Sequence, residues 1–123
     1  MKFEFGKFKS TYKVNQPRAI KMINNFCKKN IEKVSLLDKK FKHINIQNIS
    51  ENIELIECEK KRIVKIQKDL SYDLKILHAI KDIAKANIFQ RETNYLITKI
   101  EKLKNSMDQY LLLEKIYKNS TKA

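Results

Sequence analysis

The chain has almost no glycine or proline. Its only glycine is Gly6 and its only proline is Pro17, so neither residue occurs in the rest of the 123-residue sequence. Tight turns between strands depend on these two residues, and a long stretch without them argues against folds built from β-hairpins. The scarcity favours long helices joined by polar connections that contain asparagine and serine.

Long apolar runs are also missing. The longest is the three leucines at 111–113, far short of the roughly 20 residues that cross a bilayer. No apolar stretch follows the lysines near the N-terminus, so we expect no secretory signal and a cytoplasmic protein. Cys27 and Cys58 lie within helical patterns, at different distances from the turn that would join their helices, so they would not lie level with each other. We therefore expect both to be reduced thiols packed as core residues.

Groups that perform catalysis are sparse. His43 and His78 are isolated, and the sequence contains no Glu-x-x-His pair of the kind that builds a di-metal site in a helical bundle. A glycine-rich phosphate loop is excluded because no glycine follows Gly6. We therefore expect no enzyme activity, no cofactor and no metal site.

Apolar residues after Pro17 recur every three or four positions, which is the spacing of one face of an α-helix. A first helix is expected from Pro17, because proline fits the first helical turn and Asn15 or Gln16 can cap it. Asparagine recurs at residues 43–50, and the main turn is expected there.

The helical pattern after this turn is too long for the first helix to cover. It runs from residue 51 to residue 118, and a straight helix of that length would reach about 100 Å. The chain is expected to break near residue 70 or near residue 91 and fold back, unless the uncovered stripe meets a second copy in a homo-oligomer. The sequence predicts an all-α protein with three or four long helices in an antiparallel bundle, or alternatively an elongated helical hairpin.

Residues 1–16 are expected to form a short extended arm ahead of a helical domain at residues 17–123. Aromatic and basic residues alternate here with a period near two, and Gly6 with Lys7 fits a two-residue turn. An isolated hairpin is marginal in water, so the arm either packs on the helices or is ordered by a partner. Its rings could also stack on single-stranded nucleic acid. The aromatic residues assigned to the arm are Phe3, Phe5, Phe8 and Tyr12.

The net charge of +13 points to an anionic partner. Residues 1–50 hold 12 basic and 3 acidic groups, a net charge of +9, and residues 51–123 hold a net charge of +4. Only three of the 27 basic residues are arginine, whereas geometric recognition of bases and phosphates depends on arginine. Codon usage in an A/T-rich genome would also raise the lysine content. The charge therefore fits a diffuse attraction to anions.

Two groups of basic residues are candidate binding surfaces, one on the back of the first expected helix and one early in the second. Each is either a solvated face or a site for nucleic acid, an acidic protein or a membrane surface. Side by side, they would form one broad positive surface. The residues are Lys21, Lys28, Lys29, Lys33, Lys39 and Lys40 in the first group and Lys60, Lys61, Arg62 and Lys65 in the second.

Two segments resemble a known family. The start Lys7-Phe8-Lys9-Ser10-Thr11-Tyr12-Lys13-Val14, leading into a charged helix, is similar to the N-terminus of small coiled-coil stalk proteins of flagellar type III export. The stretch from Glu92-Thr93-Asn94-Tyr95-Leu96-Ile97 through Lys104 resembles later helices of stalk and export-chaperone proteins. The resemblance implies a non-catalytic helical hairpin or bundle that binds an export ATPase or substrates in transit. It assigns no functional residue.

The sequence therefore predicts a non-catalytic interaction or assembly protein that binds an acidic protein surface through the basic helix back and the N-terminal arm. The alternative is a sequence-nonspecific nucleic-acid-binding protein of viral or nucleoid type. An inhibitor that blocks a partner by shape stays open as a third hypothesis. The salt dependence of binding to generic DNA and RNA separates the first two.

Overall fold

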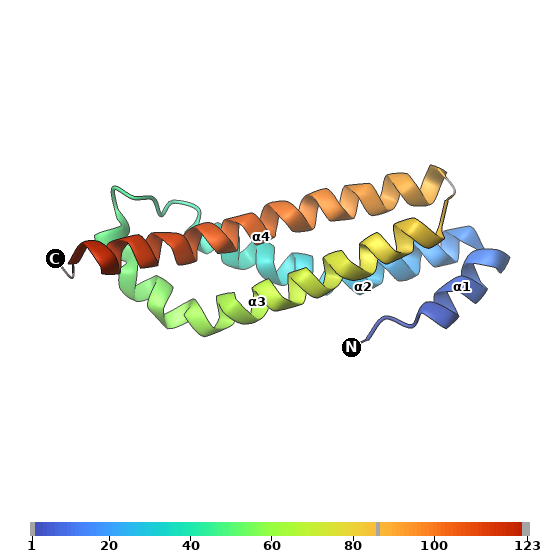
Figure 1. Ribbon diagram of the computed structural model, residues 1–123, viewed down its shortest axis with the longest axis horizontal. Coiled ribbons are helices and arrows are strands. Elements are labelled where there is room, and N and C mark those ends of the chain that lie inside the picture. Colours follow the sequence, from blue (N-terminus) through green and yellow to red (C-terminus); the bar gives the residue numbers. More distant parts are fainter. Residues whose placement is uncertain (1, 86, 122–123) are drawn as a thin grey trace.

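The computed structural model describes residues 2–85 and 87–121. The described chain forms four helices, and it contains no strand. The four helices are α1 (Phe5–Val14), α2 (Gln16–Phe41), α3 (Ile49–Ile83) and α4 (Asn87–Thr121). Figure 1 shows α2, α3 and α4 lying along a common axis, with α3 running in the opposite direction to both α2 and α4, and with α1 folded back against the start of α2. The predicted all-α antiparallel bundle is confirmed.

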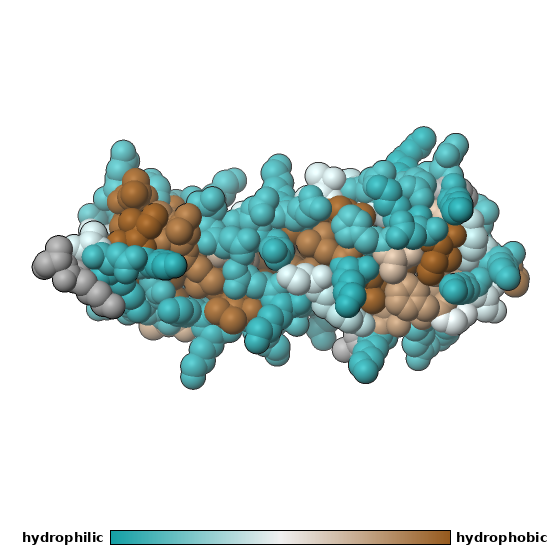
Figure 2. Space-filling model, in the orientation of Figure 1, coloured by the Kyte–Doolittle hydropathy of each residue, from teal (hydrophilic) through white to brown (hydrophobic). Residues whose placement is uncertain are grey.

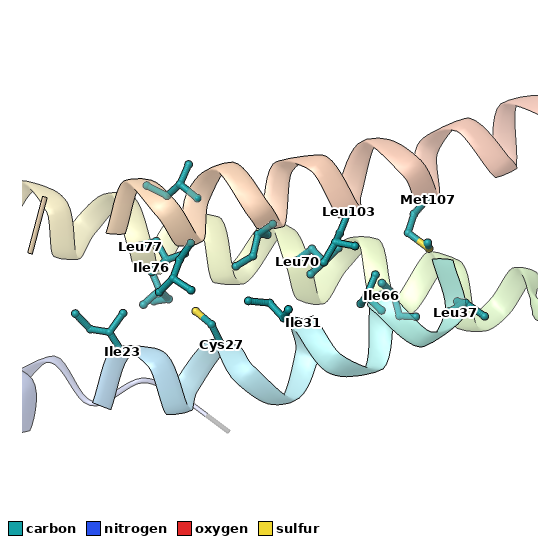
Figure 3. Close-up of a cluster of buried hydrophobic side chains, with 14 of the residues drawn as sticks. Ile23, Cys27, Ile31, Leu37, Ile66, Leu70, Ile76, Leu77, Leu103 and Met107 are labelled. Carbon is teal, nitrogen blue, oxygen red and sulfur yellow. The ribbon is translucent and has the colours of Figure 1, made fainter. Parts of the chain in front are cut away.

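The core is a continuous apolar seam between α2, α3 and α4. On α2 the buried side chains follow one another at three- and four-residue steps, and α3 and α4 carry matching stripes. Such spacing puts them on the inward face of each helix. In Figure 3 the side chains of the three helices point toward one another along the bundle. Those labelled are Ile23, Cys27, Ile31, Leu37, Ile66, Leu70, Ile76, Leu77, Leu103 and Met107.

The prediction of an extended N-terminal arm is wrong, because residues 5–14 form the helix α1. The aromatic spacing fits two structures. One is an extended strand, whose side chains repeat with a period near two, and the other is an α-helix, in which Phe5, Phe8 and Tyr12 lie three and four residues apart on one face. Burial of Phe8 in the core decides for the helix. Gly6 lies inside α1 and has no positive φ, so the expected two-residue turn does not form.

The junction between α1 and α2 follows the sequence signal closely. Asn15 caps α2, with its side-chain Oδ1 accepting a hydrogen bond from the backbone N–H of Arg18 at 3.3 Å. Pro17 occupies the first turn, where its missing N–H leaves no helical hydrogen bond unmade. The helix begins at Gln16, one residue before the expected start.

The turn between α2 and α3 lies at residues 42–48 and overlaps the expected region of residues 43–50, beginning one residue earlier. Asparagine side chains close it: the N–H of Asn45 donates to Asn48 Oδ1 at 2.8 Å, and Asn48 Nδ2 donates to the carbonyl of His43 at 2.8 Å. These bonds replace the glycine or proline that such a turn usually needs.

The second break falls near residue 85, so both expected positions, near 70 and near 91, are wrong. The helix α3 ends at Ile83 and α4 begins at Asn87. The side chain of Gln90 donates to the carbonyls of Lys81 at 2.8 Å and Ala84 at 3.0 Å. These carbonyls belong to the last turn of α3 and its cap, where helical partners run out. One amide side chain thus ties the start of α4 to the end of α3.

Polar contacts between helices fix the register of the bundle. Asn30 Nδ2 of α2 donates to Asp73 Oδ2 of α3 at 2.9 Å, and Lys28 of α2 lines a groove with Lys99 of α4. A cross-section at residue 30 of α2 therefore passes near residue 73 of α3 and residue 102 of α4. We call residues 2–30, 71–85 and 87–102 the α1 half of the bundle, and residues 31–70 and 103–121 the far half.

Candidate binding surfaces

The aromatic residues assigned to the N-terminal arm are used inside the protein. Phe8 is fully buried, and its ring lies 6.1 Å from that of Phe89 at the start of α4. Tyr12 meets the same ring at 4.5 Å, and Phe3 meets the ring of Phe26 of α2 at 5.1 Å. Phe5 is half-buried against Phe3. These rings hold α1 on the bundle, which leaves its lysines among the side chains of α1 that face solvent and can meet a partner.

The lysines assigned to the back of α2 lie on its outer side. Lys28 is close to only one carboxylate, that of Glu32, at 4.0 Å on the protein surface. The side chain of Lys40 is 3.2 Å from Glu59 of α3. Lys33 is half-buried, and the exposed members are Lys21, Lys28, Lys29, Lys39 and Lys40.

Two of the four basic residues in the α3 cluster lie next to carboxylates, one on α4 and one on α3 itself. Lys60 turns toward α4, where its Nζ lies 2.9 Å from the buried carboxylate of Glu114. Arg62 lies 3.7 Å from Glu59, the carboxylate that Lys40 of α2 also contacts. The broad positive surface expected across α2 and α3 is therefore interrupted by Glu59. The other two members, Lys61 and Lys65, are exposed.

Folding separates the charge along the bundle. The α1 half contains 14 basic and 5 acidic residues, a net charge of +9, whereas the far half contains 12 basic and 9 acidic residues, a net charge of +3. Of the six ion pairs in the described part of the chain, five lie in the far half. The sixth, Lys28–Glu32, lies at the border between the halves. The positive potential therefore concentrates at the end that carries α1.

Sequence reasoning missed a groove on the exposed face of α4. This shallow groove of about 440 Å³ is lined by Arg91, Asn94, Tyr95, Thr98, Lys99 and Lys102. Tyr95 is 60% exposed, and Lys99 Nζ lies 5.9 Å from the centre of its ring. The four-residue steps from Arg91 to Tyr95 to Lys99 were the available signal, since they put a ring between two cations on one helix face.

The far end of the bundle carries exposed apolar side chains. Ile46 of the 42–48 connection is exposed, as are Leu112 and Ile116, which lie one turn apart on α4. Figure 2 shows apolar atoms gathered over this connection and the C-terminal part of α4. The homo-oligomer expected from the sequence stays a prediction.

Three titratable groups among the described residues have raised pKa values, and all three lie in the buried part of the bundle. Burial raises the pKa of Cys27 to about 12, and the nearby Asp73 carboxylate adds to the shift. Burial also raises the pKa of Asp73. The Tyr110 hydroxyl donates to Asp38 Oδ1 at 2.6 Å, linking α4 to α2, and burial followed by this bond raises its pKa. A buried thiol and a hydrogen-bonded phenol with raised pKa values are poor nucleophiles at neutral pH.

The described residues include no group of three or more histidine, cysteine, aspartate or glutamate side chains that could hold a metal ion. Within residues 2–85 and 87–121, no helix combines the length and the apolar character needed to cross a membrane.

The arrangement therefore offers charged and aromatic surfaces rather than a pocket with reactive groups. The resemblance to flagellar export proteins stays a prediction from the sequence. No family model, curated protein or solved structure matches this chain.

Proposed function

We propose that the chain is a non-catalytic interaction protein that binds the acidic surface of a partner protein through the α1 half of its bundle. The observation that carries this proposal is the charge separation: a net charge of +9 lies in the α1 half and +3 in the far half. The helix α1 contributes Lys7, Lys9 and Lys13 to this charge, and all three are exposed.

The size of the molecule keeps the two halves electrically independent. The helices α3 and α4 have 35 residues each, which corresponds to about 52 Å of helix. The centres of the halves are thus separated by more than the Debye length of about 8 Å at physiological ionic strength. The carboxylates of the far half therefore screen the α1 half only weakly, and an acidic surface is attracted mainly to one end.

Nucleic-acid binding is a second candidate function, and one observation favours it. Tyr95 lies exposed among Arg91, Lys99 and Lys102 on the face of α4. Basic side chains around an exposed ring are typical of surfaces that hold single strands without sequence preference.

Two matched triple variants test the leading proposal. Lys7→Glu, Lys9→Glu and Lys13→Glu reverse three exposed lysines of α1, and Lys61→Glu, Lys65→Glu and Lys68→Glu reverse three exposed lysines of α3 in the far half. Both changes alter the net charge equally. None of the six lysines takes part in an ion pair of the described structure.

Fluorescent poly-L-glutamate serves as the acidic probe, with affinity measured by anisotropy at low and physiological salt. We expect the α1 triple variant to lose on the order of tenfold or more in affinity, and the α3 triple variant to lose much less, because the probe meets the α1 half. Equal losses in the two variants would contradict the proposal, as would no binding of the probe by the unchanged protein at low salt.

A further inference from the structure

We propose that the groove around Tyr95 binds single-stranded nucleic acid, with one base stacked on the Tyr95 ring and the neighbouring phosphates held by Arg91, Lys99 and Lys102. This inference rests on the second candidate function and names its binding site. It concerns a face of α4 within the α1 half, whereas the test of the leading proposal changes lysines of α1.

The groove has the composition that a stacked nucleotide needs. Arg91, Tyr95 and Lys99 lie at four-residue steps, so they follow one another along the exposed face of α4. Lys102 continues the row, and the distance from residue 91 to residue 102 corresponds to about 16 Å of helix. The remaining side chains of the groove, Asn94 and Thr98, are polar and exposed. A short run of nucleotides could therefore lie along the helix with a cation on either side of the ring.

A second groove extends this strip to α2. It has a volume of about 220 Å³ and shares Tyr95 and Lys99 with the first groove. On the α2 side it is lined by Lys28, with Glu32 4.0 Å from the lysine Nζ. Both side chains of this pair are mostly exposed to water, and such pairs are weak. With Arg91 and Lys102, the two grooves carry four cations and one carboxylate, a net charge of +3.

Tyr95 is more available for stacking than the other described aromatic residues, because it is 60% exposed, whereas Tyr117, which also lacks an aromatic partner, is half-buried against the core. Phe3, Phe8, Tyr12 and Phe89 pack against one another, and Tyr72 meets Phe26 at 6.2 Å. Tyr95 has no aromatic partner among the described rings. Its one ring contact is Lys99, 5.9 Å from the ring centre, near the outer limit of a cation–π interaction. A base can replace this contact while Lys99 turns to a phosphate.

Single strands fit this site better than a duplex. A base inside a duplex is stacked on its neighbours and cannot lie on a protein ring unless it is flipped out, whereas every base of a single strand presents an open face. An acidic peptide would use the cations of the groove but has no flat ring to place on Tyr95. The ring is thus the feature that distinguishes these occupants.

The test measures binding of a fluorescent 20-nucleotide oligo(dT), a DNA duplex of equal length and poly-L-glutamate by anisotropy. The variants are Tyr95→Ala, which removes the ring, and Tyr95→Phe, which keeps it. Leu112→Ala is the matched control, because Leu112 is an exposed apolar residue on the same helix but in the far half. Tyr95 is more than half exposed, so its replacement should leave the fold intact, which circular dichroism checks.

We expect Tyr95→Ala to weaken binding of oligo(dT) on the order of tenfold and to leave binding of poly-L-glutamate unchanged, since stacking contributes only to the nucleic acid. Tyr95→Phe and Leu112→Ala should bind oligo(dT) like the unchanged protein, and the duplex should be insensitive to all three changes. Equal binding of oligo(dT) by Tyr95→Ala and the unchanged protein would overturn the inference, as would an equal effect of Tyr95→Ala on the duplex.

The outcomes separate this inference from the leading proposal. Failure of oligo(dT) to bind, together with tight binding of poly-L-glutamate, would overturn the Tyr95 site and leave the acidic-partner proposal standing. Failure of both probes at low salt would overturn both proposals.

Discussion

Asp73 is a carboxyl group placed almost entirely out of water, between α2 and α3. It is 1% exposed, and its one hydrogen bond within the described part of the chain is the 2.9 Å bond from the Asn30 amide. Burial raises its pKa, against the lowering effect of the Asn30 bond, and the nearby Asp69 adds to the rise. Ionised Asp73 therefore weakens the fold at neutral pH, since desolvation of the charge exceeds the gain from one hydrogen bond.

Replacement of Asp73 by asparagine should stabilise the protein increasingly as the pH rises. The unfolded carboxyl titrates near pH 4, and the folded group titrates higher, so between these values the folded state binds more protons. The free energy of unfolding of the unchanged protein must then fall with rising pH relative to Asp73→Asn. Urea unfolding of both proteins from pH 3.5 to pH 7 measures this difference. A difference that does not change with pH, or grows toward low pH, would refute the assignment.

The two cysteines occupy opposite environments, which corrects the expectation that both are core residues. Cys27 is fully buried with a pKa of about 12, whereas Cys58 is exposed on α3. Both are free thiols, as the sequence predicted.

In native buffer Ellman's reagent should therefore react rapidly with one thiol per chain, and the second should react only after unfolding. Cys58→Ser should abolish the fast phase. Two fast thiols in the unchanged protein, or a fast phase that survives Cys58→Ser, would show that α2 is not packed as described.

At the level of elements, the helix α1 depends on one side chain. Phe8 is the only fully buried residue that α1 contributes, and it packs between Phe3, Tyr12 and Phe89. A ten-residue helix is marginal on its own in water, so its order comes from this cluster. The position of Lys7, Lys9 and Lys13 on the bundle depends on it in turn.

Phe8→Ala should lower the free energy of unfolding by about 3 kcal/mol, because it removes a large buried ring and leaves a cavity. Amide hydrogen exchange should quicken most in α1. Lys9→Ala is the matched control on the same helix, and as an exposed change it should shift stability by less than about 0.5 kcal/mol. Unchanged exchange in α1 of the Phe8 variant would contradict the packing of this helix.

The elements differ in how far the sequence could predict them. The helical fold and the α1–α2 junction follow from local signals: no glycine or proline after Pro17, and Asn15 in a capping position. The break at residue 85 has no such signal, because Gln90 closes it from the following helix. The helix α1 was missed because its aromatic spacing fits two periods, and only the contact of Phe8 with Phe89 decides between them.

The candidate site was the harder part to predict. The sequence shows which residues on α2 and α3 are basic, but it does not show which of them lie next to a carboxylate in the folded protein. Lys40 and Arg62 are 22 positions apart in the sequence and reach the same carboxylate, Glu59, only in the folded bundle. Likewise Lys28 of α2 and Tyr95 of α4 line one groove only because the two helices pack side by side.

At the scale of the whole molecule, the antiparallel arrangement turns a gradient of charge along the chain into a separation of charge in space. The start of α2, the end of α3 and the start of α4 meet at one end, and α1 is folded against them (Figure 1). This end holds most of the net positive charge, and the one described ion pair that it shares is Lys28–Glu32 at the border between the halves. The far end holds Glu57 and Glu59 of early α3, which pair with Lys118 of α4 and Lys40 of α2, and Glu114 of α4, which pairs with Lys60 of α3.

The most direct test of this central claim is to titrate poly-L-glutamate into ¹⁵N-labelled protein and record which backbone amides shift. We predict that the shifts concentrate in residues 2–30 and in the parts of α3 and α4 between residues 71 and 102. Shifts spread evenly along the bundle, or centred on Lys61 and Lys65 in the far half, would contradict it.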